Sequence, residues 1–177
     1  MLRAASSKKN NASGHRFAIV ASTYNARYVN SMCRAAEKTL AAAGAAEIKV
    51  VRVPGAFEVP LAAAALAEWN DPSYAAVICL GVILRGRTSH AQHIAEAVTQ
   101  ALVQIQLDQR KPVIHEVLLL ENDEQAVQRC LDAKHNRGIE AAQTAIAMAN
   151  LLKELSGAAA GKTRSKARNR SNKAARR

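Results

Sequence analysis

Basic and hydroxyl side chains gather in one short stretch of the chain, GVILRGRTSHAQHI, over residues 81–94. Arg87 and Thr88 precede a predicted helix, where backbone N–H groups, a hydroxyl and the positive helix end can hold a phosphate. His90 falls in the first turn of that helix, where the dipole favours the neutral imidazole, the form that accepts a proton. The stretch therefore predicts an anion site beside a general base. His93 is the competing base, and a solvent-facing histidine is the alternative for both.

Two further stretches carry groups suited to a small polar ligand. Tyr24 can present its flat ring to a planar heterocycle, and a half-exposed packing role is equally open. In VPGAFEVP, residues 53–60, Gly55 permits backbone conformations that other residues avoid, and Glu58 offers two acceptors to hydroxyl groups. A plain turn with Phe57 in the core is the alternative interpretation of this motif.

Two more residues have weaker signals on their own. Arg129 follows a predicted short helix, from which a guanidinium can reach the same phosphate, and a surface arginine is the alternative. His115 lies in an apolar strand, where a core histidine with satisfied hydrogen bonds is the default. The three cysteines show no spacing typical of a disulfide framework or a zinc site, so we expect no metal and a reducing cytoplasm.

The elements that must position these residues alternate between strands and helices. Hydrophobic periodicity predicts strands at 15–22, 48–53, 75–84 and 113–120, and helices at 26–43, 60–69, 90–107, within 121–132 and at 139–155. Right-handed crossovers place helices on both faces of a parallel sheet. The sequence therefore predicts an α/β, three-layer αβα sandwich, flavodoxin-like, with a four-stranded mainly parallel sheet whose carboxyl edge carries the candidate residues.

The positive charge lies at the two ends of the chain. The net charge is +11, yet residues 14–160 are formally neutral, because eight basic and no acidic side chains lie between Gly161 and Arg177 and three more basic ones precede residue 10. We expect a polar basic extension at 1–15, a domain at 16–155 and a disordered basic tail at 156–177. The tail is either simply solvated or binds RNA or another polyanion. No apolar run is long enough to suggest a membrane partner.

Taken in order, the motifs resemble those of lumazine synthase. The resemblance covers about residues 16–155 and rests on VPGAFEVP, GVILRGRTSH, ENDEQAVQR and HNRGIEAA. It implies a transferase of riboflavin biosynthesis that condenses 5-amino-6-(D-ribitylamino)uracil with 3,4-dihydroxy-2-butanone 4-phosphate. The products would be 6,7-dimethyl-8-ribityllumazine, phosphate and water, formed without a metal or an organic cofactor.

The resemblance also implies a role for each matching residue. His90 would transfer protons, and Tyr24 would stack on the pyrimidine ring. Ala56, Phe57 and Glu58 would bind the same substrate, with Glu58 on the ribityl hydroxyls. The remaining matches would line the ring with backbone groups (Val82, Ile83 and Leu84) or hold the butanone phosphate (Arg87, Thr88 and Arg129).

Three positions depart from the family pattern. His115 stands where an aromatic residue usually closes the site from a neighbouring subunit. Ala91 stands where an aromatic often follows the catalytic histidine, and Arg87 where a small or acidic residue is usual.

The resemblance implies a homo-oligomer. It is a pentamer that in some members assembles further into a decamer or a sixty-subunit shell. An uninserted loop between Arg129 and Gly138 is compatible with a shell.

Two functions of other classes remain open from the sequence. A packaging protein built on an inactive shell would use the basic tail to bind nucleic acid. A flavodoxin-like carrier would retain a stoichiometric flavin, whereas the enzyme would turn over its two small-molecule substrates.

Overall fold

Four parallel strands form the centre of the molecule. The computed structural model describes residues 11–68 and 74–174, with side chains as far as Ser156. The sequence also predicts a turn at 70–73, and these residues lie outside the described ones. The sheet has the order β2-β1-β3-β4, and every pairing is parallel. The strands are β1 (Arg16–Ser22), β2 (Glu47–Val53), β3 (Ala76–Leu84) and β4 (Val113–Leu120).

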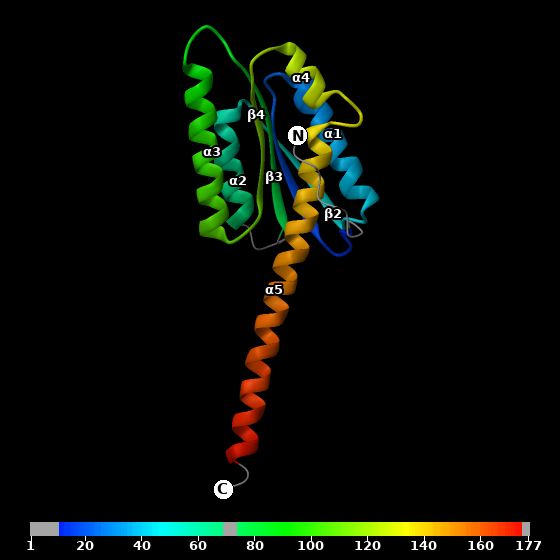
Figure 1. Cartoon of the computed structure of the whole chain (residues 1–177), viewed down its shortest axis with the longest axis vertical. Helices are drawn as coiled ribbons and strands as arrows, with labels where there is room; N and C mark the ends of the chain where they lie inside the picture. The colour runs from blue at the N-terminus through cyan, green and yellow to red at the C-terminus, as the bar shows by residue number, and fades with distance from the viewer. Residues whose placement is uncertain (1–10, 69–73, 175–177) are drawn as a thin grey trace.

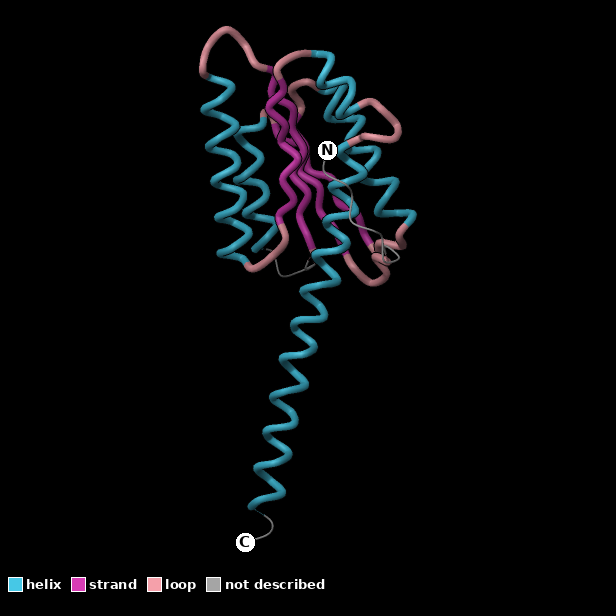
Figure 2. Tube along the Cα trace, viewed as in Figure 1, coloured by secondary structure: helices cyan, strands magenta, loops and turns pink. Residues whose placement is uncertain are grey.

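Helices cover both faces of this sheet, which confirms the predicted three-layer sandwich of flavodoxin-like type (Figures 1 and 2). One face carries α2 (Val59–Glu68), which follows the short helix η1 (Ala56–Glu58), and α3 (His90–Gln109). The other face carries α1 (Ala26–Ala42), α4 (Asp123–Cys130) and α5 (Arg137–Ala174). Each face encloses its own hydrophobic cluster, because a central parallel strand is buried on both sides.

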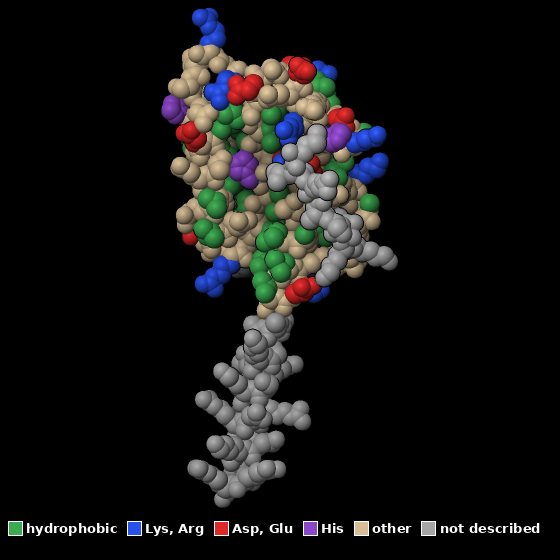
Figure 3. All heavy atoms as spheres, viewed as in Figure 1, with side chains coloured by type: hydrophobic (Ala, Val, Ile, Leu, Met, Phe, Trp, Pro, Cys, Tyr) green, Lys and Arg blue, Asp and Glu red, His purple; other side chains and the backbone are tan. Residues whose placement is uncertain are grey.

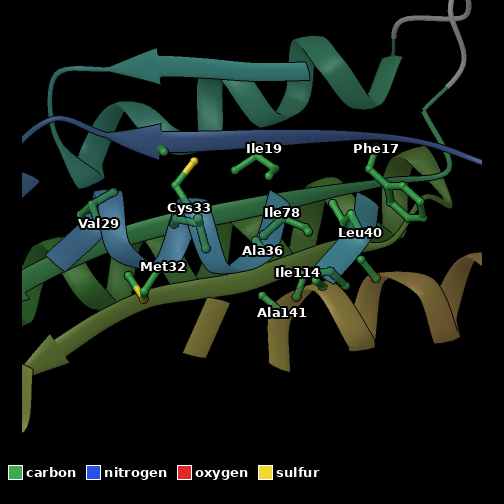
Figure 4. Close-up of a cluster of buried hydrophobic side chains, with 14 of the residues drawn as sticks. Phe17, Ile19, Val29, Met32, Cys33, Ala36, Leu40, Ile78, Ile114 and Ala141 are labelled. Carbon is green, nitrogen blue, oxygen red and sulfur yellow. The ribbon is translucent and has the colours of Figure 1, made fainter. Parts of the chain in front are cut away.

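The face between β1, β3 and α1 shows how the apolar spacing becomes a core. Val29, Met32 and Leu40 recur at helical intervals along α1 and are fully buried against the sheet (Figure 4). By contrast, α3 buries Val98 but leaves Ala97 exposed, although the spacing predicts Ala97 to face inward. The stripe that α3 turns to the sheet is therefore narrower than the sequence suggests.

The HNRG motif brings α5 close to α1. A Cβ added to Gly138 would overlap the backbone carbonyl of Met32, so only glycine allows the two helices to approach this closely. Asn136 is buried beside it, where its Oδ1 accepts a hydrogen bond from the Gly138 N–H at 2.9 Å and its Nδ2 donates to Ser31 Oγ at 3.2 Å. This motif therefore serves helix packing.

The last helix is longer than predicted. Its backbone continues to Ala174. The sequence predicts instead that the domain ends at Leu155 and that a disordered tail follows. Alanine, lysine and arginine have high helix propensity, which gives a physical reason for the longer helix. The structure describes no side-chain contacts beyond Ser156, so the division of the chain into domain and tail remains a prediction.

Candidate active site

The loops that follow β1 and β2 are joined by hydrogen bonds. The Thr23 N–H donates to the Val53 carbonyl at 2.8 Å, the Thr23 hydroxyl donates to the Pro54 carbonyl at 2.9 Å, and the Tyr24 N–H donates to the same carbonyl at 3.1 Å. These bonds place the Tyr24 ring beside Gly55. The exposed fraction of Tyr24 is 68%, so most of the ring is accessible to a ligand.

Gly55 and Glu58 complete this corner of the site. The Gly55 N–H donates to Glu58 Oε2 at 2.9 Å, which holds the carboxylate at the start of α2. Gly55 has an extended backbone with φ of −128°, so the expectation that it adopts a conformation closed to other residues is wrong. Glycine is required for space instead, because a Cβ would lie 2.9 Å from Glu58 Oε2 and 3.1 Å from the Tyr24 ring.

The exposure of Phe57 and the burial of Ala56 distinguish the two interpretations of the VPGAFEVP motif. Phe57 has an exposed fraction of 62%, which contradicts the alternative in which its ring lies in the core. Ala56 is buried against α2 and α3. Phe57 is the middle residue of the short helix η1, and its exposed ring is accessible to a ligand.

Asn25 connects this corner to β3, and sequence reasoning assigned it no role. Its backbone is left-handed, with φ of 54°, a conformation that asparagine tolerates better than most residues. Its Nδ2 donates to the Val82 carbonyl at 2.8 Å. The predicted ring-lining residues therefore lie beside the β1 loop, with Val82 and Ile83 buried and Leu84 half-buried.

The turn after β3 carries the predicted anion site and base. Arg87, Thr88 and His90 are all exposed, and the His90 N–H donates to Thr88 Oγ1 in a long bond of 3.4 Å. Ser89 occupies the N-cap position of α3, yet its side chain makes no capping hydrogen bond. The first amides of α3 therefore keep donor capacity at the positive end of the helix, as an anion site requires.

Arg85 anchors the same turn to β4, a role that the sequence did not indicate. Its backbone N–H donates to the Leu120 carbonyl at 2.8 Å. Its guanidinium donates to Glu121 Oε1 and to Gln92 Oε1, both at 2.9 Å. The β3 turn is thus held between the end of β4 and the first turns of α3.

His115 and Arg129 lie apart from these residues. His115 lies beside Cys79 of β3 in the strand register. It is five positions before the end of β4, and so about 17 Å along the strand from the carboxyl edge of the sheet. Its side chain reaches α3 by a hydrogen bond to Thr99. Arg129 lies on α4, on the opposite face. No hydrogen bond or ion pair among the described residues joins either one to Tyr24, Glu58 or His90.

Comparison with known proteins supports a single family. Residues 14–153 match the family described as 6,7-dimethyl-8-ribityllumazine synthase. Enzymes of that name from Stenotrophomonas maltophilia (strain R551-3), Aquifex aeolicus (strain VF5) and Mycobacterium avium (strain 104) are 43%, 42% and 40% identical to the chain. The alignments cover 79%, 81% and 81% of this chain and 90%, 94% and 89% of the respective relatives.

The chain belongs to the lumazine synthase family. This confirms the resemblance that the four ordered motifs indicate. The roles of individual residues remain predictions, and the geometry above shows which of them one chain brings together. Tyr24, Gly55 and Glu58 form one connected corner, which the bond from Asn25 to Val82 ties to β3, whereas His115 and Arg129 make no described hydrogen bond or ion pair with this corner.

A buried carboxylate lies next to His115 and was missed by sequence reasoning. Glu116, with an exposed fraction of 6%, accepts a hydrogen bond from Arg137 Nε at 3.1 Å, and Arg137 also pairs with Glu140. Burial raises the pKa of the Glu116 carboxyl, while the positive charges of Arg137 and Arg129 oppose that rise in pKa. An acid within the apolar run VIHEVLLL is the signal that could have found it.

Two hollows on the surface of the described residues lie on helices. One, of about 490 Å³, lies against α4 and is lined by Glu124, Val127, Gln128, Leu131 and Asp132. The other, of about 280 Å³, lies against α3 and is lined by Gln92, Ala95, Glu96, Thr99 and Gln100. Neither hollow includes Tyr24, Glu58 or His90, so neither encloses the predicted substrate site.

The described residues offer no other centre of chemistry. Across 11–68 and 74–174 there is no group of three or more His, Cys, Asp or Glu side chains that could hold a metal ion. Within the same residues, no helix is both long and apolar enough to cross a membrane. Cys33 and Cys130 are buried free thiols, and burial raises the pKa of each to about 11, so both are unreactive near neutral pH.

Proposed function

We propose that this enzyme, a transferase of the lumazine synthase family, condenses 5-amino-6-(D-ribitylamino)uracil with 3,4-dihydroxy-2-butanone 4-phosphate at the carboxyl edge of its sheet. The products are 6,7-dimethyl-8-ribityllumazine, phosphate and water, in the penultimate step of riboflavin biosynthesis. The observation that carries the proposal is the connected corner of Tyr24, Gly55 and Glu58, joined through Asn25 to the Val82 carbonyl. It offers a ring face, a carboxylate and backbone groups within one small area.

The pyrimidine substrate occupies this corner. The Tyr24 ring stacks on the pyrimidine, Glu58 accepts hydrogen bonds from ribityl hydroxyls, and Ala56 and Phe57 contact the same substrate. The backbone groups of Val82, Ile83 and Leu84 line the ring. The carboxylate is positioned before binding by its hydrogen bond from Gly55, which reduces the entropy lost on binding.

The phosphate of the second substrate lies at the start of α3. Arg87 and Thr88 hold it together with the uncapped amides of the helix. His90 lies between the phosphate and the pyrimidine corner, where it moves protons as the amine attacks the ketone, phosphate leaves and the ring closes. Holding the two substrates together supplies much of the rate, because a reaction between two free molecules becomes one within a complex.

A neighbouring copy of the chain supplies His115 and Arg129. Within one chain these residues lie away from the pyrimidine corner, on or beyond the edge strand β4. Hydrophobic side chains lie exposed on the side of the molecule where α3 and α5 flank the edge strand β4 (Figure 3). Leu107 of α3 and Leu155 of α5 are both exposed. Such a surface is typical of an interface between subunits. We infer a pentamer with sites between adjacent subunits, compatible with further assembly into a decamer or a sixty-subunit shell.

The basic tail is proposed to bind a polyanion, such as RNA, in addition to catalysis. The support is its composition, eight basic and no acidic side chains between Gly161 and Arg177. In an oligomer, several tails would act together and strengthen binding. We also propose that the enzyme works in a reducing cytoplasm, on the basis of three buried free thiols.

Purified protein supplied with both substrates tests the catalytic proposal. We expect a product with the absorbance and fluorescence of a lumazine, and a slower turnover in His90→Ala with substrate binding largely retained. A second sample that lacks 161–177 separates the two activities, because turnover should survive while salt-sensitive RNA binding is lost. Absence of product from both samples would contradict the proposed enzyme, and a stoichiometric bound flavin would support a carrier instead.

A further inference from the structure

The His115 ring is held by hydrogen bonds at both of its nitrogens. Its Nε2 lies 2.8 Å from the Thr99 hydroxyl oxygen on α3. Its Nδ1 lies 3.3 Å from the Val117 backbone nitrogen, two residues further along β4. The Thr99 hydroxyl makes one more bond, a donation to the Ala95 carbonyl at 2.8 Å. The ring is thus fixed between an edge strand and the helix that covers it.

These partners define where the protons lie. A backbone N–H only donates, so the bond from Val117 requires an unprotonated Nδ1 on His115. The single hydroxyl proton of Thr99 is used by the Ala95 carbonyl, so its oxygen accepts from the histidine. Nε2 therefore carries the proton, and the ring is neutral. Burial acts in the same direction, because it lowers the pKa of His115, although a backbone hydrogen bond of the same residue opposes that shift.

We propose that Thr99 is a positioning residue that locks His115 as the neutral Nε2–H tautomer, with its ring face fixed for the pyrimidine bound to a neighbouring copy. The proposal rests on the proposed function, in which His115 closes the site of the adjacent subunit. An imidazolium would be costly there, since a second subunit would cover it and no described contact of the ring within its own chain is with a carboxylate. A neutral, oriented ring stacks without that cost.

The position of Thr99 fits this role. It lines the hollow of about 280 Å³ on α3 and is exposed, so its hydroxyl is not needed to fill the core. His115 is half-buried on β4, on the same face of the sheet as the helix. Thr39 provides a matched control, because its hydroxyl makes the same bond to a carbonyl four residues earlier, Ala35, at 2.8 Å on α1, with no histidine partner.

The test compares Thr99→Val and Thr99→Ser with the wild type and with Thr39→Val. Solid-state NMR of the assembled, ligand-free protein labelled with ¹⁵N in histidine reports the protonation of each ring nitrogen, and His115→Phe identifies the signals of interest. We expect a single Nε2–H tautomer in the wild type, a mixture of tautomers in Thr99→Val, and the wild-type pattern in Thr99→Ser and Thr39→Val. Thermal unfolding and assembly size should be the same in all four.

Kinetics give the second readout. Because only a fraction of His115 rings would then hold the binding-competent tautomer, KM for the pyrimidine should rise about fivefold in Thr99→Val, with kcat and the KM of the phosphate substrate unchanged. Thr99→Ser should restore the wild-type KM. An unchanged tautomer or an unchanged pyrimidine KM in Thr99→Val would overturn the proposal. Failure of the wild type to form product would instead refute the proposed function, so the two failures are distinguishable.

Discussion

Two regions of the molecule carry the predicted site residues, and they differ in how they are held. Hydrogen bonds from Thr23 and Tyr24 join the loops after β1 and β2, and a bond from Asn25 ties them to Val82 of β3, so one chain assembles this region before any substrate binds. The region of β4 and α4 holds its residues on opposite faces of an edge strand. This difference supports the proposal that the first region is a preformed half-site and that the second contributes to the site of a different copy of the chain.

Mixing two inactive variants gives the largest effect and tests that comparison directly. His90→Ala removes the proposed proton-transfer residue of the first region, and Arg129→Ala removes the proposed phosphate ligand of the second. If each site combines regions of two chains, one site in four of a random mixed assembly is intact, so about a quarter of the wild-type rate should return. The rate of co-expressed, differently tagged variants measures this. A rate no higher than the mean of the two pure variants would place the whole site within one chain.

Crowding the first region should weaken pyrimidine binding. Gly55→Ala places a Cβ against Glu58 and the Tyr24 ring, and we expect KM for the pyrimidine to rise on the order of tenfold through steric displacement. Steady-state kinetics and thermal unfolding measure the effect. Gly86→Ala is the comparison in the β3 turn, because a Cβ there meets no atom within 4 Å and leaves stability unchanged. Equal pyrimidine KM values for Gly55→Ala and the wild type would show that the corner is looser than its geometry indicates.

The free energy of unfolding should depend on pH through Glu116, the buried carboxylate of the second region. Because the pKa of Glu116 is raised in the folded state, the unfolded chain loses this proton first as pH rises. The contribution of Glu116 to the free energy of unfolding therefore falls between the unfolded and the folded pKa. Glu116→Gln removes this dependence, so its stability relative to the wild type should improve with rising pH. The loss of stability should stay below the roughly 3–5 kcal/mol of an unpaired buried charge, because Arg137 keeps its ion pair with Glu140. Denaturant unfolding at several pH values measures this, and a constant difference at all pH values would argue against it.

The smallest effect should come from the link between the two regions. Arg85→Ala removes the ion pair with Glu121 and the bond to Gln92, both exposed, but keeps the backbone bond to Leu120. Exposed pairs contribute about 0.2–1 kcal/mol, so we expect a loss of unfolding free energy within that range. Chemical denaturation detects it. A loss of several kcal/mol would mean that the β3 turn depends on this side chain rather than on its backbone.

The positions of the first region's residues in the fold could be predicted from the sequence because their signals are local. Short motifs placed Tyr24, Glu58 and His90 directly after strands, and parallel strands bring their carboxyl ends to one edge. The reason for Gly55 was wrong, since the constraint is the approach of a side chain from another loop and not its own backbone angles. The hydrogen bond of Asn25 could not be predicted for the same reason, because its partner Val82 lies 57 residues away.

The sequence by itself determined the order of elements, the parallel sheet and the family, because apolar periodicity and ordered motifs are properties of neighbouring residues. Only the tertiary structure decided that His115 meets Thr99, that Glu116 is buried against Arg137, and that neither His115 nor Arg129 is joined to the pyrimidine corner. These contacts depend on which face of β4 each residue takes and on which helix covers that face. Packing of distant segments sets both, and no local pattern records them.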